Sequence, residues 1–301
     1  METEEGKQSK FTLKNILNIL FIILILKSLV SGLSGSIYPP NIEVMNIEGV
    51  IQYSSKGNFK HTTDVLSGVA LRAPKALIVR INSPGGTVGA SQEIYDALKK
   101  VRKSGTKVVV LMEDVAASGG LYVAVAADKI VANPGTLTGS IGVIMQTTEY
   151  SKVLEWLHIK TNTIKSGKFK DTGSPNREMT EAERDLLQGI IQSTYEQFLS
   201  TVATERKIDP AVVRTFADGR IFNGAQAKEY GIVDEVGGFD VALRVAKELG
   251  GIPDGKEQIG YVDHHATFFE TLSNGVSTGF NLDKLFSKSD LSGIPLYMML
   301  N

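Results

Sequence analysis

A serine followed by two glycines is the feature of this sequence best suited to nucleophilic chemistry. Ser118 follows an apolar run that predicts a strand, and it precedes Gly119, Gly120 and a run of small residues that predicts a helix. A serine on such a strand-to-helix turn is presented to a substrate, and glycine neighbours let a peptide backbone approach it. The amide of Gly119, at the helix start, would point to where an oxyanion forms. We therefore expect Ser118 to be a nucleophile and Gly119 an oxyanion donor.

A second glycine turn lies at the end of the preceding predicted strand. Residues 81–86 read Ile-Asn-Ser-Pro-Gly-Gly, and the amide of Gly85 could be aimed at the same oxyanion position. Active sites of open α/β sheets lie at such strand ends. Either turn alone is more often structural than catalytic, but two of them on successive units favour a catalytic site.

The base that would activate Ser118 has several candidates. Cysteine is absent, and there are four histidines, none of them in a glycine-rich turn: His61, His158, His264 and His265. We expect these histidines to be surface or packing residues. A lysine can replace histidine as a base if burial lowers its pKa. The basic segment 164–174 offers Lys165, Lys168 and Lys170, although such a segment is usually solvated.

The elements that must position these residues alternate between strand-like and helix-like patterns from residue 41 onward, which predicts an α/β fold with a mostly parallel sheet. The predicted strands are residues 42–51, 75–83 and 107–112, and the predicted helices between or after them are residues 90–102 and 119–127.

Helices are also predicted in the second half of the chain. Thr180 begins a helix that runs to about residue 206, with a capping box to Glu183 and an apolar face, including Leu186 and Ile190, that we expect to pack on a neighbour. Asp209 begins another. Residues 219–236 and 239–249 complete the folded part, and the tail from residue 251 is expected to be partly disordered or docked.

The N-terminus predicts a membrane anchor. An apolar segment, residues 16–26, follows three lysines and precedes Lys27. It is short for a span of about 20 residues, but lysines at its ends can snorkel. The lysine excess before the segment places the N-terminus in the cytoplasm and the remainder outside the cell membrane as a single-pass protein. A cleaved signal peptide, cut within the small residues 31–36, and a buried helix are the alternatives.

These patterns divide the chain into residues 1–36 with the anchor, a domain of residues 37–250, and a tail of residues 251–301. Lys and Arg total 32 against 33 Asp and Glu, which argues against a nucleic-acid partner. Dinucleotide, Walker and His-Glu-x-x-His motifs are absent from the sequence, so we expect no cofactor and no metal.

The ordered motifs resemble those of the short-form signal peptide peptidase SppA family, peptidase family S49. The motifs are Ile-Asn-Ser-Pro-Gly-Gly at 81–86, Ala-Ala-Ser-Gly-Gly at 116–120, Thr-Gly-Ser-Ile-Gly-Val at 138–143, Ser-Gly-Lys-Phe-Lys-Asp at 166–171 and Gly-Arg-Ile-Phe at 219–222. The resemblance covers roughly residues 40–250 and implies a ClpP/crotonase-like fold.

The resemblance also implies residue roles. Ser118 would be the nucleophile, Lys170 the general base, and Ser140 the residue that orients the base, while Gly85 and Gly119 match the oxyanion donors. Leu121 departs from the family, which often has an aromatic residue there.

Hydrophobic peptides, namely signal peptides left in the membrane, are the substrates that the resemblance implies, and a homo-oligomer such as an octameric ring is the implied assembly. An acyl-CoA enzyme of the crotonase type and a scaffold without activity are the alternatives. The apolar segment 296–300 could occupy a peptidase cleft as a product would.

Overall fold

The computed structural model describes residues 39–53, 58–262 and 296–298, and the described residues from Asn41 onward belong to one compact unit. Its helices are α2 (Asn58–Arg72), α3 (Val88–Lys103), α4 (Gly119–Ala124), α5 (Ser151–Trp156), α6 (Glu181–Arg206), α7 (Pro210–Arg214), α8 (Gly224–Glu229) and α9 (Phe239–Gly250). Its strands are β1 (Ile42–Glu48), β2 (Ala76–Ser83), β3 (Gly85–Thr87), β4 (Lys107–Ala117), β5 (Lys129–Ala132), β6 (Leu137–Gly139), β7 (Ile221–Asn223), β8 (Glu235–Val236), β9 (Ile259–Tyr261) and β10 (Leu296–Met298).

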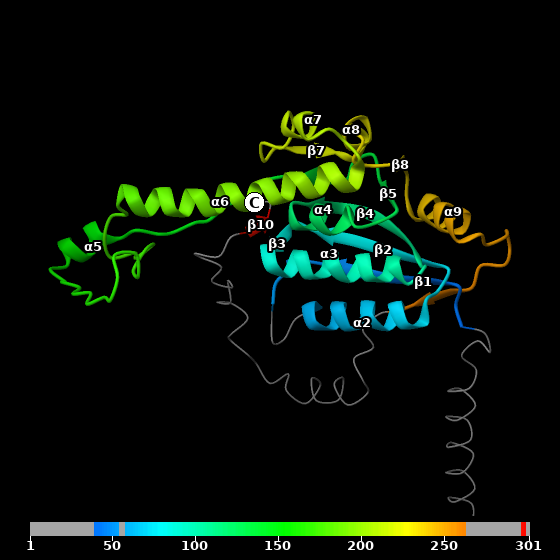
Figure 1. Cartoon of the computed structure of the whole chain (residues 1–301), viewed down its shortest axis with the longest axis horizontal. Helices are drawn as coiled ribbons and strands as arrows, with labels where there is room; N and C mark the ends of the chain where they lie inside the picture. The colour runs from blue at the N-terminus through cyan, green and yellow to red at the C-terminus, as the bar shows by residue number, and fades with distance from the viewer. Residues whose placement is uncertain (1–38, 54–57, 263–295, 299–301) are drawn as a thin grey trace, which may run out of the picture. The chain divides into compact units, whose positions relative to one another are not determined.

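A mostly parallel sheet forms the centre of the described chain, in the order β7-β6-β4-β2-β1-β9, with β5 beside β4 and β8 beside β5. All of these pairs are parallel except β6 with β7. This confirms the predicted α/β class. Parallel strands need crossover helices, and α2 and α3 supply the crossovers between the central strands (Figure 1).

The central strands carry apolar side chains toward both faces of the sheet because both faces are covered. On one face, Leu77, Val79 and Ile81 of β2 pack in a cluster that includes residues of α3, α4 and α6. On the other face, Ala76 and Ile78 of β2 pack with residues of α9. Successive side chains of β2 therefore face opposite sides of the sheet, and one of these sides faces α3, α4 and α6.

Most of the predicted elements are found. The long helix begins after Thr180 with a complete capping box to Glu183, and Asp209 caps α7 through its side chain. β4 extends to residue 117, five residues beyond the predicted strand. The chain also continues the sheet past residue 250, because β9 pairs with β1.

One segment projects from the sheet. We call residues 145–190 the arm; it contains α5 and the first part of α6 (Figure 1). The remaining described residues from 41 to 262 are called the body. Of the apolar face predicted for α6, Phe198 is buried in the core of the body, whereas Leu186 and Ile190 in the arm are 42% and 44% exposed.

The predicted anchor, residues 1–36, lies outside the described residues. Within the described ranges, a search for helices with the length and apolarity of a membrane span finds none.

Candidate active site

Ser118 is held in a strained and buried position at the junction of β4 and α4. It precedes the first residue of α4, its backbone has φ 51° and ψ −114°, and it is 1% exposed. A non-glycine residue in such a region costs on the order of 1–3 kcal/mol. Among the described residues, its buried Oγ has no hydrogen-bond partner. A hydroxyl that is buried, strained and without a partner fits a nucleophile better than a structural turn.

Ser140 lies beside Ser118 because of the strand register. In the parallel pair β4–β6, Ala117 is opposite Gly139, so the two serines that follow are also neighbours. The Ser118 amide donates to the Gly139 carbonyl over 2.9 Å, which fixes this pairing. Ser140 also has a positive φ, 51°, and its amide donates to the Arg220 carbonyl. The structure thus brings together the predicted nucleophile and the predicted orienting serine.

The start of α4 leaves amides free for an oxyanion. The first hydrogen bond of this helix runs from the Tyr122 amide to the Ser118 carbonyl over 2.9 Å. The amide of Gly119 therefore has no partner inside α4. A Cβ added at Gly120 would lie 2.9 Å from the Ser83 carbonyl oxygen, so only a glycine lets α4 approach the end of β2 so closely.

The second predicted oxyanion donor is engaged in a local hydrogen bond. The Gly85 amide donates to Ser83 Oγ over 3.1 Å. Gly86 follows in β3, where a Cβ would lie 1.8 Å from the Ile51 carbonyl oxygen. Because Gly85 and Thr87 make the backbone hydrogen bonds to Ile51, the amide and carbonyl of Gly86 face the opposite side of β3.

The C-terminal strand β10 lies on that opposite side. It pairs antiparallel with β3, with Leu296 opposite Thr87, Tyr297 opposite Gly86 and Met298 opposite Gly85. An extended segment of this chain thus adds a strand to the glycine turn of the site, as peptides do when they bind to a sheet edge. The tail segment that was expected to occupy a cleft is thus paired with β3; its occupation of a cleft stays a prediction.

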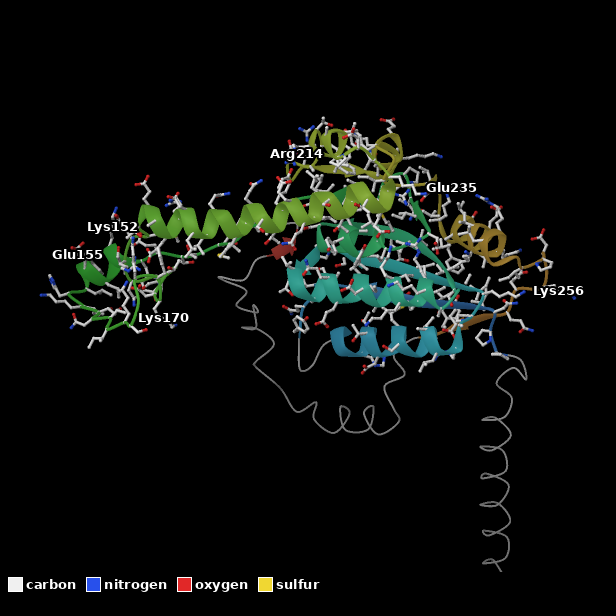
Figure 2. All side chains as sticks on the ribbon, in the orientation of Figure 1. Lys152, Glu155, Lys170, Arg214, Glu235 and Lys256 are labelled. Carbon is white, nitrogen blue, oxygen red and sulfur yellow. The ribbon has the colours of Figure 1, made fainter. Side chains whose placement is uncertain are left out.

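Lys170 is not brought to Ser118 within one chain. It is exposed and lies with α5 at the end of the arm, away from the helices that cover the sheet (Figure 2). The alternative lysines lie in the same exposed segment: Lys165 pairs with Asp171, and the Lys168 amine lies 5.1 Å from the ring centre of Phe169.

Of the four histidines, which were the other candidates for the base, two lie within the described residues. His61 is exposed on α2, and His158 is exposed on the arm just after α5. His264 and His265 lie outside the described residues.

The segment around Lys170 is fixed by a cluster of charged residues that the sequence did not suggest. Arg177 binds both Asp171 and Glu183, and we call these three residues the arm clamp. The Arg177 guanidinium, and then Lys165, hold the pKa of Asp171 well below its usual range. Hydrogen bonds from Arg177 and then from the Thr180 backbone lower the pKa of Glu183 to about 2. The capping box was visible in the sequence, but the second partner of Glu183 was not.

The body end of α6 packs directly on the nucleophile helix. The rings of Tyr122 and Phe198 meet edge to face with centroids 5.2 Å apart, and Tyr95 lies 5.3 Å from Tyr122. Leu121, which departs from the pattern of the resembled family, is fully buried in the core of the body. α6 therefore joins the surroundings of Ser118 to the arm that carries Lys170.

Comparisons with known proteins match this chain to peptidases. A family described as peptidase family S49 matches residues 100–252, and one described as Clp protease matches residues 45–141. A candidate protease of Synechocystis sp. is 40% identical over 74% of this chain and 80% of its own length. A candidate signal peptide peptidase SppA of Enterococcus faecium is 40% identical over 59% of this chain and 52% of its own length. The chloroplastic serine protease SPPA of Arabidopsis thaliana is 36% identical over 61% of this chain and 27% of its own length.

The chain therefore spans about half or less of the last two relatives. Among solved structures, the membrane-bound stomatin-specific protease 1510-N is 16% identical over 75% of this chain and 99% of that one, with a TM-score of 0.48. A ClpP1 mutant of Listeria monocytogenes is 20% identical over 66% of this chain and 94% of that one, with a TM-score of 0.44.

Proposed function

The chain belongs to peptidase family S49 and is a serine peptidase, and from this premise we propose that it cuts apolar peptides with a Ser118–Lys170 dyad shared between two copies of the chain. Membership of this family leaves aside the two alternatives, an acyl-CoA enzyme and a scaffold without activity. The observation that carries the proposal is the buried Ser118 hydroxyl, which is strained and without a partner among the described residues.

The shared dyad follows from where the two residues lie. Ser118 is in the body, whereas Lys170 lies near the end of the arm with α5 (Figure 2). α6 is a single helix of 26 residues from the clamp to the body. Bringing Lys170 to the serine of its own chain would require this helix to break. Delivery to the serine of a second copy requires no such change, and an arm that leaves its own body is suited to it.

The surface of the arm supports assembly with other copies. Large apolar side chains lie open to solvent there, among them Trp156 at 77%, Ile164 at 100% and Val153 at 54%. Such an apolar surface favours contact with another protein. Repeated head-to-tail contact, in which each arm reaches the next body, gives a ring where the rotation between neighbouring copies closes on itself. A homo-oligomeric ring, octameric by the family resemblance, is the assembly that we propose.

In the proposed mechanism, the amine of Lys170 takes the proton of Ser118 Oγ as the oxygen attacks the peptide carbonyl carbon. Burial beneath the second copy would keep this amine neutral, and Ser140, beside Ser118, would hold it by a hydrogen bond. The Gly119 amide, and that of Gly85 once released from Ser83, would bind the oxyanion. The leaving amine takes the proton from Lys170, and water then releases the acyl group from Ser118.

The substrate class follows from the family and from the N-terminal segment. Signal peptides left in the membrane are the proposed substrates. Residues 16–26 would anchor the enzyme in the cell membrane by a single pass, with the N-terminus in the cytoplasm and the peptidase domain outside. An enzyme held at the membrane surface meets such apolar peptides where they are left.

The test mixes two inactive variants. Ser118→Ala and Lys170→Ala are each purified, shown to be inactive on a fluorogenic apolar peptide, and then dissociated and reassembled together. A dyad shared between copies restores activity, to about a quarter of wild type for random mixing, because each site needs one copy of each kind in a fixed order. Mixtures that stay inactive would contradict the shared dyad, and activity of Lys170→Ala alone would contradict Lys170 as the base.

A further inference from the structure

We propose that Arg177 is a positioning residue for Lys170: by binding Asp171 and Glu183 together, it fixes the lysine segment to the start of α6. The inference rests on the proposed function, in which Lys170 is the base. Arg177 would touch neither the substrate nor the reacting atoms, and it would act only through where it places Lys170.

The segment before Lys170 has no packed core to hold it, and besides the arm clamp it is held by Lys165, which pairs with Asp171 and donates to the Lys168 carbonyl over 3.1 Å. Every residue from 155 to 170 is exposed, and no regular secondary structure is present between α5 and α6. Its local backbone bonds are those of turns, such as the Lys170 amide to the Gly167 carbonyl at 3.1 Å. A segment without a core owes its conformation to polar contacts, and the arm clamp provides these next to Lys170.

The geometry of Arg177 suits this role because its guanidinium bridges two carboxylates. Nε donates to Asp171 Oδ2 over 3.0 Å, and Nη2 donates to the Asp171 carbonyl over 3.3 Å. Nη1 and Nη2 donate to the two oxygens of Glu183 over 2.8 and 2.5 Å. A planar fork with several donors can hold both partners in a fixed relation, which the single ammonium of a lysine cannot do.

The far end of the clamp is anchored in the helix. The Glu183 side chain is 2% exposed, although it is charged, and it also accepts from the Thr180 amide over 3.0 Å in the capping box. At the near end, Asp171 follows Lys170 directly in the chain. The connection therefore runs from α6 through Glu183, Arg177 and Asp171 to the backbone of Lys170.

An ordinary surface ion pair on the same helix provides the contrast. Arg214 binds Glu196 of α6 through two hydrogen bonds of 2.8 Å, but these side chains are 52% and 42% exposed. The pair lies on the body, remote from Lys170 (Figure 2). Arg214→Ala therefore removes an arginine–glutamate pair from α6 without disturbing the lysine segment, and it is the matched control for Arg177→Ala.

The experiment measures kcat and KM of the full chain on a fluorogenic apolar peptide for wild type, Arg177→Ala, Arg177→Lys and Arg214→Ala. We expect Arg177→Ala to lower kcat roughly 100-fold with KM little changed, because a displacement of about 1 Å of a catalytic group can cost that much. Arg177→Lys should recover little of the loss, and Arg214→Ala should match wild type. If Arg177→Ala does not fold, Arg177→Lys, which keeps the charge, takes its place.

Two further readouts separate positioning from a general loss of stability. The acidic limb of the kcat/KM profile should move to higher pH in Arg177→Ala, since a misplaced amine is less buried and holds its proton more tightly. In a double-mutant cycle, adding Asp171→Asn to Arg177→Ala should cost little more than Arg177→Ala alone, because both changes break the same connection.

The outcomes distinguish this inference from the proposed function. If Lys170→Ala is inactive but Arg177→Ala has wild-type kcat, or if Arg177→Ala and Arg214→Ala lose activity equally, the positioning role is overturned while Lys170 stays the base. If Lys170→Ala is active, the base assignment itself fails, and the positioning role fails with it.

Discussion

The body and the arm hold their proposed catalytic side chains by different contacts: apolar packing in the body and ion pairs in the arm. In the body, Ser118 follows a strand whose last residues pair with β6 and is surrounded by core residues, so its unusual backbone angles are imposed by packing. In the arm, Lys170 lies in an exposed segment without regular structure, and charged side chains take the place of a core. The proposed nucleophile thus has its surroundings complete within one chain, whereas the proposed base would gain them only from a second copy.

This difference teaches that the two residues of the proposed dyad are held by different physical forces. Apolar packing, which is insensitive to salt and to mild acid, determines the geometry of Ser118. Ion pairs, which depend on protonation, determine that of Lys170. Changes in the body should therefore affect stability and activity together, whereas changes in the arm should affect activity more than stability.

The sharpest test in the body replaces Ser118 itself. Ser118→Gly should abolish turnover, with a loss of roughly 10,000-fold or more. It should also raise the free energy of unfolding by about 1 kcal/mol relative to Ser118→Ala, because only glycine adopts φ 51° and ψ −114° without strain. Thermal unfolding of the two variants measures this. Equal stability of the two would mean that packing has not imposed strain on Ser118.

The next test compares one glycine in each region. Gly86→Ala in the body should lower the free energy of unfolding by about 1–3 kcal/mol, because its Cβ would meet the Ile51 carbonyl at 1.8 Å and the backbone must shift. Turnover should fall with it, roughly 100-fold, as β3 moves.

Gly189→Ala in the arm is the counterpart. No atom lies within 4 Å of the added Cβ, and the position is inside α6, so a gain of roughly 0.5–1 kcal/mol is expected. Denaturant unfolding and peptide turnover of both variants are the measurements. Equal changes in the free energy of unfolding and in turnover for Gly86→Ala and Gly189→Ala would contradict the difference between a packed body and an exposed arm.

The C-terminal strand gives a smaller effect on the body. Because β10 pairs with β3 at the glycine turn, a chain that ends at residue 289 should turn over an apolar peptide roughly two to five times faster at low substrate. A synthetic peptide of residues 294–301 should then inhibit the shortened enzyme competitively, and a scrambled peptide should not. Unchanged turnover on removal of the tail would show that β10 does not compete with substrate.

Lowering the pH should unfold the arm before the body. This is the smallest of the expected effects. The pKa of Glu183 is lowered to about 2 and that of Asp171 is lowered as well, so their ion pairs stabilise the folded arm at neutral pH. This contribution is lost as the pH falls from about 4 through the folded values. Pepsin, which works in acid, should cut the arm increasingly between about pH 4 and pH 2 while the body persists. In Arg177→Ala the cut should occur already at the upper end of this range.

The sequence predicted the body well because its signals are local. Apolar runs bounded by glycine located β2 and β4, and the position of Ser118 between a strand and small residues is a property of neighbours in the chain. The capping box at Thr180 located the start of α6 for the same reason.

Nonlocal features could not be read in this way. The arm clamp joins Asp171 to Glu183 through Arg177, but a cluster of charges in a polar segment gives no pattern that distinguishes it from solvated residues. The apolar positions of α6 predicted a packed face, yet Leu186 and Ile190 are exposed, because periodicity reports an apolar face and not what covers it. The separation of Lys170 from Ser118 depends on the direction in which α6 leaves the sheet, and no motif encodes that direction.

The contact of α6 with α4 links the surroundings of Ser118 to the segment that carries Lys170. Phe198 packs on Tyr122 one turn after the nucleophile, and 15 residues earlier in the same helix Glu183 holds the segment of Lys170. The helix is about 39 Å long at 1.5 Å per residue, and it behaves as one stiff rod. In the proposed assembly, a displacement of α4 in one copy would therefore be carried along α6 to the lysine that this copy offers to the next one.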